Sequence, residues 1–401
     1  NILEYIKKYK ILLRPHAGDI MNPFNPGFGK KPEIFLDRQF LVQKVTDELE
    51  NPNSPYRTSL IYGLRGSGKT AFLTDASTAV AAKKGWIVLN LAMSDSILPN
   101  LIVELYRKAN SPLQKLFSQI KGVNISAFGV DFSIGSSQPS LTSYQTLFAD
   151  MLDKLRSRGL DLFITIDEID NTPAIKEFAS LYQLMLRENY SLALMMTGLP
   201  HKISELQNDK ILTFLLRSSR INLEPIALTS IKYSYQKSFR DAGFTVEDAA
   251  LTTMARMTAG YAYAFQLLGY QIWNRAAQGA PVTPGLLEQE VPEFKMQLFH
   301  NVYTKVFQEL SPKDREFLLA MAQCVNGASA VPRVPTNTGI ANVRISDISG
   351  RMGKGPNYIS MYRRRLLDSQ IIQATGHGTV SFTLPFMSDF IIENHELYAG
   401  D

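Results

Sequence analysis

Cysteine and histidine are scarce in this sequence, which has 1 cysteine and 5 histidines in 401 residues. The lone Cys324 excludes an intramolecular disulfide and a cysteine-rich zinc site, as is typical of a protein kept in a reducing cytoplasm. No His/Glu metal motif, Cys/His pair or Gly-x-Ser-x-Gly nucleophile motif is present. No apolar run approaches the roughly 18–20 residues that span a bilayer, so we expect a cytoplasmic protein without a membrane partner.

Basic residues are unevenly distributed along the chain. The formal net charge is +5 and the isoelectric point about 9.0. Between positions 344 and 365, six basic residues accompany one acidic residue, Asp347. Residues 1–34 form a candidate basic extension, in which a possible start, MNPFNPGFG, begins at Met21. Such clustering is typical of a nucleic-acid or other anionic partner, and a solvated surface explains it as well.

The segment GLRGSGKT, residues 63–70, matches the phosphate-binding pattern G-x-x-x-x-G-K-[ST]. It lies between a short strand pattern, TSLIY, and a helix pattern, which is the context that the motif requires. Its glycines allow the backbone to wrap a phosphate, and the first amides of the helix bind the anion. We expect Lys69 to reach the β and γ phosphates and Thr70 to bind Mg²⁺. The predicted nucleotide-binding residues of this loop are Gly63, Leu64, Arg65, Gly66, Ser67, Gly68, Lys69, Thr70 and Ala71.

Two acidic residues, Asp167 and Glu168, end the apolar strand pattern LFITIDEID. Two adjacent carboxylates at the end of a buried strand are energetically unfavourable, so their presence there indicates a function. We expect Asp167 to hold Mg²⁺ and Glu168 to polarise the water that attacks a phosphoanhydride. The alternative is a helix cap by Asp170 beside exposed acids, which accounts for Asp170 but not for the doublet.

Three further strand patterns, at residues 85–92, 190–198 and 219–226, complete a parallel sheet. Helix patterns separate them, so the sequence predicts an α/β P-loop domain with wound topology. The pattern at 190–198 ends near Thr197, where a hydroxyl could orient the attacking water. A threonine that merely caps the strand is the alternative.

These motifs together resemble the AAA+ ATPases, and most closely the origin-recognition initiator ATPases and the prokaryotic STAND-like ATPases. The resemblance spans roughly residues 35–390 and implies binding of ATP or ADP with Mg²⁺ and slow hydrolysis of ATP. The segment FLDRQFLVQKVTDEL is similar to the family's adenine-contacting segment, which assigns Phe35 and Arg38 to the site, although Asp37 replaces the usual glycine. Arg217 in LLRSSR is similar to an arginine finger, with Arg220 as the other candidate, and implies a homo-oligomer with sites completed in trans. A surface arginine is the alternative.

One motif departs from these families. The segment GYAYAFQLLGYQIW, from Gly260, has neither the second-sensor arginine of the initiators nor the Gly-x-Pro of the STAND-like group. Tyr261 and Tyr263 cannot replace a cation on the γ phosphate, so we expect them to belong to the core of a helical lid. This puts nucleotide sensing by the lid in doubt.

The remaining patterns divide the chain around the ATPase domain, residues 35–227. Alternation within residues 122–137 predicts an inserted β-hairpin, which could contact DNA or a neighbouring subunit or simply decorate the sheet edge. Helix patterns predict a helical lid at 228–282 and a linker helix at 283–310 that is interrupted at Pro292.

Residues 311–401 are predicted to form a winged helix, with three helix patterns followed by two strands around His377. The third helix of such a fold enters the major groove, with its basic flanks near phosphates. The candidate DNA-binding residues are Lys354, Asn357, Tyr358, Ser360, Tyr362, Arg363, Arg364, Arg365 and His377. Consecutive helix residues point about 100° apart, so we expect one or two arginines to face DNA and another to form an ion pair, for instance with Asp368. Met361, Leu366 and Leu367 are expected to face the core.

The sequence therefore predicts an AAA+ ATPase whose winged helix engages double-stranded DNA according to nucleotide state. The alternative is a STAND-like signalling switch, in which the winged helix contacts a protein partner. A degenerate nucleotide-binding scaffold with negligible turnover is a third reading, against which Glu168 argues.

Overall fold

The computed structural model describes residues 21–27, 34, 38–120, 124–126, 129–131, 141–210, 212–327 and 341–398. The chain forms two compact units. One is Arg38–Glu224, and the other combines Pro225–Asp401 with the residues before Arg38. No helix among the described residues is long and apolar enough to cross a membrane.

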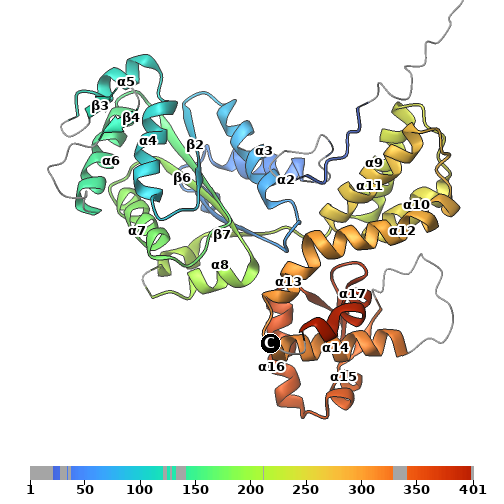
Figure 1. Ribbon diagram of the computed structural model, residues 1–401. Coiled ribbons are helices and arrows are strands. Elements are labelled where there is room, and N and C mark those ends of the chain that lie inside the picture. Colours follow the sequence, from blue (N-terminus) through green and yellow to red (C-terminus); the bar gives the residue numbers. More distant parts are fainter. Residues whose placement is uncertain are drawn as a thin grey trace, which may run out of the picture. The chain divides into compact units, whose positions relative to one another are not determined.

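The Arg38–Glu224 unit is built on a five-stranded parallel sheet with the order β2-β5-β6-β1-β7 (Figure 1). Its strands are β1 (Thr58–Tyr62), β2 (Trp86–Ala92), β5 (Asp161–Asp167), β6 (Leu192–Gly198) and β7 (Ser219–Asn222). The inner strand β6 is buried at every position, which is why LALMM reads as one apolar run. The wound α/β fold predicted from the sequence is confirmed.

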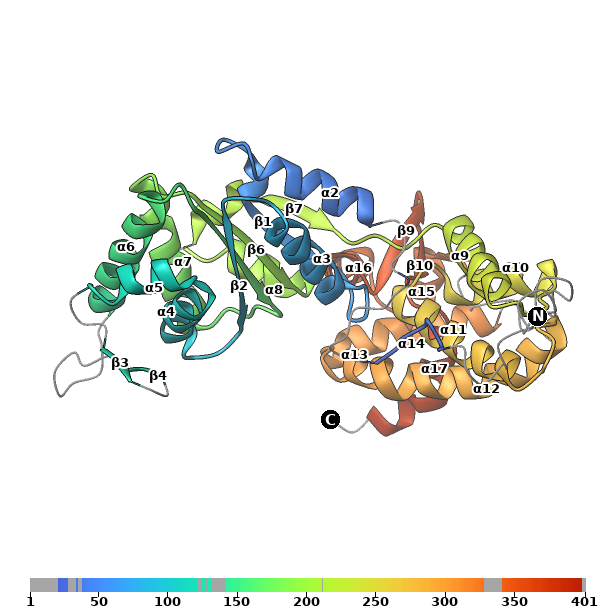
Figure 2. The same cartoon turned by 90° about the horizontal axis from the view of Figure 1, so that it is seen from above.

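Helices cover both faces of this sheet (Figures 1 and 2). They are α2 (Gln39–Glu48), α3 (Lys69–Ala81), α4 (Ile97–Lys108), α5 (Ser111–Phe117), α6 (Leu141–Arg156), α7 (Pro173–Arg187) and α8 (Pro200–Gln207), with short 3₁₀ turns at Pro55–Arg57 and Thr213–Arg217. Thr172, and not Asp170, caps α7 by accepting from the Ile175 N–H, with a proline at the first helical position. Between α5 and α6, β3 (Asn124–Ser126) and β4 (Gly129–Asp131) pair antiparallel, and the rest of 122–137 lies outside the described residues.

The helical part of the second unit comprises α9 (Leu228–Asp241), α10 (Asp248–Thr258), α11 (Ala262–Ala277) and α12 (Pro284–Leu298). Tyr261 is buried in it, as expected of lid core. Residues 21–27, which the sequence places in an extension, also belong here, because Phe24 is 1% exposed among aromatic rings of α9 and α11. The sequence interpretation missed this because a seven-residue segment has no helix or strand period.

The predicted break of the linker at Pro292 is wrong. Helix α12 runs through Pro292, and the irregularity is a π-helical turn, η3 (Phe299–Tyr303), before α13 (Thr304–Gln308). Phe299, Tyr303 and Phe307 are spaced by four, and the wider turn keeps all three rings within 5.3 to 5.8 Å of the Phe390 ring centroid. Aromatic packing, rather than the proline, therefore sets the position of the distortion.

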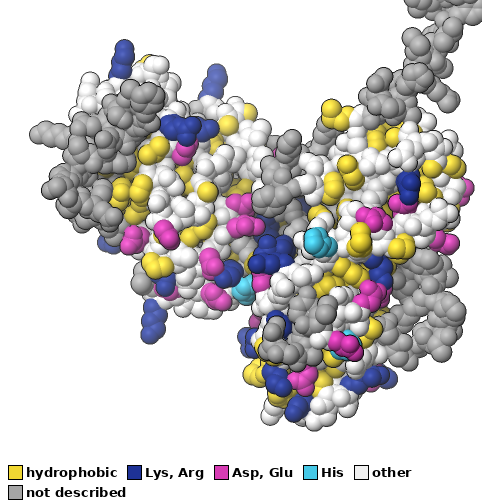
Figure 3. Space-filling view, viewed as in Figure 1, with side chains coloured by type: hydrophobic (Ala, Val, Ile, Leu, Met, Phe, Trp, Pro, Cys, Tyr) yellow, Lys and Arg dark blue, Asp and Glu magenta, His cyan; other side chains and the backbone are white. Residues whose placement is uncertain are grey.

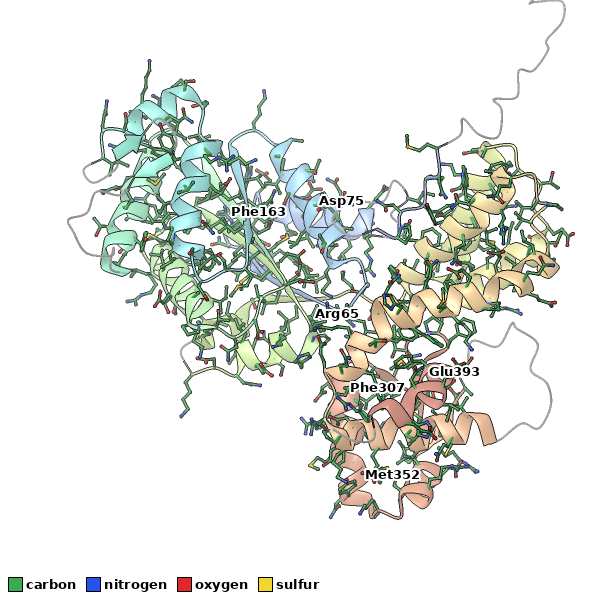
Figure 4. All side chains as sticks on the ribbon, viewed as in Figure 1. Arg65, Asp75, Phe163, Phe307, Met352 and Glu393 are labelled. Atoms are coloured by element: carbon green, nitrogen blue, oxygen red, sulfur yellow. The ribbon has the colours of Figure 1, made fainter. Side chains whose placement is uncertain are left out.

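The C-terminal part is a winged helix, as predicted. It contains α14 (Pro312–Gly327), β8 (Val343–Arg344), α15 (Ile345–Met352), α16 (Pro356–Asp368), β9 (Ile372–Gly376) and β10 (Thr379–Phe382), and the antiparallel sheet has the order β8-β10-β9. A further helix, α17 (Met387–Asn394), follows the wing and packs against α14. Lys295 of α12 bridges to Asp389 and Glu393 of α17 at 2.9 and 3.1 Å, and Figure 4 marks Glu393 on α17.

Candidate nucleotide site and winged-helix surface

The loop between β1 and α3 has the backbone geometry of a phosphate cradle. Gly66 and Gly68 have φ values of 75° and 91°, a region that residues other than glycine rarely adopt. A Cβ on Gly63 would lie 2.6 Å from Ser67 Oγ, so a side chain at this position would force the Ser67 hydroxyl to move. Gly68 offers no side chain to cap α3, which leaves the first amides of this 13-residue helix oriented for an anion. Figure 4 shows Arg65 on this loop and Asp75 on α3.

Lys69 folds back onto the same loop. Its Nζ donates to the carbonyl oxygens of Gly63 and Leu64 at 3.0 and 2.9 Å, and the residue is 8% exposed. Burial lowers the pKa of Lys69 from 10.5 to about 8, and the nearby carboxylates of Asp167 and Glu168 only partly oppose this. Two neutral carbonyl oxygens of the loop therefore hold the ammonium group.

Asp167 at the end of β5 joins two strands and the start of α3. Thr70 Oγ1 donates to Asp167 Oδ2 at 2.6 Å, and the Thr197 hydroxyl at the end of β6 donates to Asp167 Oδ1. The three side chains come together because parallel neighbours β5 and β6 end at one edge of the sheet, next to the start of α3. The predicted Mg²⁺ ligands Thr70 and Asp167 are thus adjacent oxygen donors, which suits a hard cation.

Glu168 has a left-handed backbone, with φ at 53°. Its N–H donates to Asp167 Oδ1 at 3.0 Å and to Thr197 Oγ1 at 3.2 Å, so two bonds hold a conformation that is rare for a residue with a side chain. The Glu168 side chain is exposed. Thr197 therefore fixes the backbone of Glu168 in addition to contacting Asp167, a role that the sequence did not reveal.

A second pair at this edge was also missed. Lys202, in the first turn of α8, donates to both carboxylate oxygens of Asp170 at 2.8 Å. This hydrogen bond is the main reason why the pKa of Asp170 lies below 3.8. The pair ties the segment after β5 to the segment after β6. The only signal in the sequence was a lysine shortly after the strand that ends at Gly198.

The other residues assigned from the resemblance have varied positions. Phe35 lies outside the described residues. Arg38 is 6% exposed, and its guanidinium donates to the Glu224 carbonyl at 3.0 Å. Arg217 ends the turn Thr213–Arg217 and Arg220 lies on the edge strand β7; both are exposed. Tyr263 accepts a hydrogen bond from Asn301 at 2.8 Å and carries no charge for a phosphate.

In the winged helix, α16 divides the three arginines among different environments. Arg364 is exposed and lies 3.9 Å from Asp368, Arg365 pairs with Asp314 at 2.8 Å, and Arg363 is half-buried. The expected ion pair with Asp368 is thus a weak, exposed one, and the stronger partner is on α14. Sequence reasoning missed Asp314 because it is 51 residues away from Arg365.

Two assignments on α16 need correction. Tyr362, a candidate DNA contact, is 8% exposed, while Met361, expected in the core, is 49% exposed. The buried face consists of Ile359, Tyr362 and Leu366, spaced by three and four. Leu366 faces the core as predicted, and Leu367 is half-buried. Tyr358 packs on Tyr362 at 4.7 Å and is half-buried.

The solvent-facing side of α16 carries Asn357, Ser360, Met361 and Arg364. Arg351 and Lys354 are exposed just before this helix, and His377 is exposed at the tip of the wing. In the view of Figure 3, the Lys and Arg side chains at the bottom, over the winged helix, are interspersed with Asp and Glu rather than merged into one patch. The surface is basic but broken by acids.

Comparison with solved structures agrees with this architecture. The chain is similar to the ORC2 protein of Aeropyrum pernix, solved as ADPNP–ADP complexes, with a TM-score of 0.60 and 14% identity over 94% of this chain and 98% of that one. It is also similar to a Walker-type ATPase of Pyrococcus abyssi, with a TM-score of 0.55 and 17% identity over 94% and 99%. The chain thus shares the fold of these two proteins, and at these identities the likeness shows the fold alone.

The sequence comparisons add little to this. A family described only as a domain of unknown function, DUF8462, matches residues 300–391, which include the winged helix. No curated protein matches the chain.

Proposed function

We propose that the protein is an ATPase whose winged helix binds double-stranded DNA in a nucleotide-dependent manner. One observation supports the proposal most strongly. Five side chains lie together at one edge of the sheet: Lys69, Thr70, Asp167, Glu168 and Thr197. This arrangement supports a part for each of them in phosphoryl transfer to water.

Each side chain of this site has a distinct role in the proposed reaction. Lys69 and the amides at the start of α3 bind and orient the phosphates of ATP. Thr70 and Asp167 would hold Mg²⁺, which when bound neutralises charge on the phosphate oxygens. The exposed carboxylate of Glu168 accepts a proton from water aligned with the γ phosphate, and Thr197 keeps Glu168 in position. Chemistry of this kind depends on positioning, so small displacements at Glu168 should slow it strongly.

The DNA part of the proposal is supported by the face of α16. Asn357, Ser360 and Arg364 share the exposed side of a helix that would enter a major groove, and Arg351 and Lys354 flank its start. The polar side chains suit base edges, and the cations suit phosphates.

A titration of the full chain with a fluorescent random duplex, with ATP or ADP and at two salt concentrations, tests this directly. We expect tighter binding with one of the two nucleotides and an affinity that falls steeply with salt. Arg364→Ala should weaken the binding. Arg107→Ala, which removes an exposed arginine of α4, is the matched control and should bind as wild type does. Binding that ignores nucleotide and salt would contradict the proposal.

A second candidate function is a nucleotide-controlled switch whose winged helix binds a protein. Two observations favour it. The wing residues 373–378 contain no lysine or arginine for phosphate contacts, and Met361 gives the exposed face of α16 an apolar centre. Copurified ADP in a chain that binds no duplex would favour this function over the first.

The arginine finger remains a proposal about assembly. Arg217 and Arg220 are both exposed, as a residue acting on a neighbouring subunit must be. Mixing a variant that lacks the finger with Glu168→Gln should restore partial ATP hydrolysis if Arg217 acts in trans, because some sites then combine an intact Glu168 with an intact arginine. No restoration with either Arg217→Ala or Arg220→Ala would exclude the trans arrangement.

A further inference from the structure

The segment 21–27 packs into the helical lid through one buried aromatic side chain, Phe24. Phe24 is 1% exposed, and its ring centroid lies 5.5 to 6.0 Å from those of Tyr235, Phe239, Phe265 and Trp273. The neighbours of Phe24 in the chain, Pro23 and Asn25, are only half-buried. A single aromatic anchor inserted between helices, with half-buried neighbours on both sides, is a pattern of peptide recognition rather than of an ordinary core segment.

Polar contacts fasten the segment on both sides of the anchor. Asn22 Nδ2 donates to the Tyr270 carbonyl at 3.1 Å and to Asn274 Oδ1 at 2.9 Å. The Asn25 N–H donates to Gln266 Oε1 at 2.9 Å, and Gln266 Nε2 donates to the Ile34 carbonyl at 2.7 Å. One buried amide side chain on α11 therefore holds two points of the chain that lie nine residues apart.

The receptor depends on Gly269, in the middle of α11. A Cβ there would lie 2.4 to 2.7 Å from three ring carbons of Phe24, closer than real contacts allow. Glycine is unfavourable within a helix. Its presence at position 269 lowers the helix propensity of α11 and leaves space for the Phe24 ring.

We propose that the helical lid carries a receptor site for the Asn22-Pro23-Phe24 segment, which binds there as an intramolecular ligand. The Phe24 ring fills the site between α9 and α11, and the Asn22 side chain and the Asn25 N–H fasten the segment to α11. This inference does not rest on ATP hydrolysis or on DNA binding.

A labelled synthetic peptide of residues 21–27, added to the full chain, tests the receptor. It should bind Phe24→Ala, whose site is vacated, at least tenfold more tightly than wild type, whose site is filled. It should fail to bind the double variant Phe24→Ala with Gly269→Ala, in which the methyl group blocks the site. The matched control, Phe24→Ala with Gly285→Ala, should bind as Phe24→Ala does, since a Cβ at Gly285 has only one neighbour, at 3.8 Å. Equal binding to wild type and Phe24→Ala, or binding to neither, would overturn the receptor.

Hydrogen exchange covers the case in which Phe24→Ala does not fold. Asn22→Ala removes three hydrogen bonds without opening an apolar cavity, two that Asn22 donates and one that it accepts from the Phe24 N–H, and it should speed exchange of the Asn25 amide at least tenfold. Gly269→Ala should also speed this exchange, because the methyl group displaces the Phe24 ring, whereas Gly285→Ala should leave it unchanged. Unchanged exchange in both Asn22→Ala and Gly269→Ala would overturn the ligand role.

Discussion

Arg365 on α16 donates to the buried carboxylate of Asp314 on α14, with 2.8 Å between Nη2 and Oδ2. The Asp314 side chain is 4% exposed and that of Arg365 is 53% exposed. Ser311 Oγ donates to the same oxygen at 2.6 Å. The last arginine of the triplet therefore joins two helices of the winged helix, and its contribution is to stability.

Loss of this ion pair should destabilise the winged helix. Asp314→Ala removes two hydrogen bonds to a charged group, and we expect a loss of about 2–3 kcal/mol in the free energy of unfolding. The matched control is Asp368→Ala, whose pair with Arg364 is long and exposed, and which should change stability very little. Urea unfolding measures both variants, and an equal loss in the two would contradict the distinction.

The same geometry separates two arginines in DNA binding. Arg364→Ala should weaken duplex binding and reduce the salt slope by about one unit, because one phosphate contact is lost. Arg365→Ala should lower stability and leave the salt slope unchanged, since its charge is already paired with Asp314. Anisotropy at several salt concentrations distinguishes them, and identical slopes for both variants would remove Arg364 from the interface.

Lys69 should make stability depend on pH in the alkaline range. Its pKa falls from 10.5 to about 8 on folding, so between these values the unfolded chain binds more protons and stability rises with pH. At pH 7 the burial of charged Lys69 lowers the free energy of unfolding by on the order of 3 kcal/mol for a shift of this size. This loss disappears as pH rises from about 8 to 10.5. Lys69→Met should therefore be more stable than wild type at pH 7 and lose that advantage by pH 10. A constant difference across this range would contradict the lowered pKa.

Gly260 should be intolerant of any side chain. It has φ at 79°, and a Cβ would lie 2.6 Å from the Ile226 carbonyl oxygen, a backbone atom that cannot easily move. We expect Gly260→Ala to cost about 1–2 kcal/mol for the backbone conformation, with the steric clash in addition. Gly279→Ala is the matched control, since its φ is 92° and a Cβ there has no neighbour within 4 Å. Thermal unfolding should show the larger loss for Gly260→Ala, and equal losses would show that the contact with Ile226 is unimportant.

The parallel sheet and the nucleotide site could be predicted because their signals are local. The phosphate loop is contiguous, and the strands that carry Asp167 and Thr197 end in polar residues after mostly apolar runs. Neighbouring parallel strands bring such ends together. Thr70, Asp167 and Thr197 are accordingly found in contact.

What could not be predicted depends on contacts between distant segments. Phe24 has its partners more than 200 residues away, and Lys202 meets Asp170 only because two loops end side by side. Tyr362 and Met361 differ by one step of the helix, and a stripe of three apolar positions did not fix which of them faces the core. Pro292 was overestimated as a helix breaker, because propensity yields to packing in the linker.

The central claim is that Glu168 activates water for ATP hydrolysis, and the rate of phosphate release by the Glu168→Gln variant tests it most directly. The variant should bind a fluorescent ATP analogue as wild type does and hydrolyse ATP at least about a hundredfold more slowly, since loss of a general base costs 10²–10⁴ in rate. Glu177→Gln, an exposed acid of α7, should retain the wild-type rate. Equal hydrolysis by wild type and Glu168→Gln would contradict the account and leave a nucleotide-binding protein without this catalytic site.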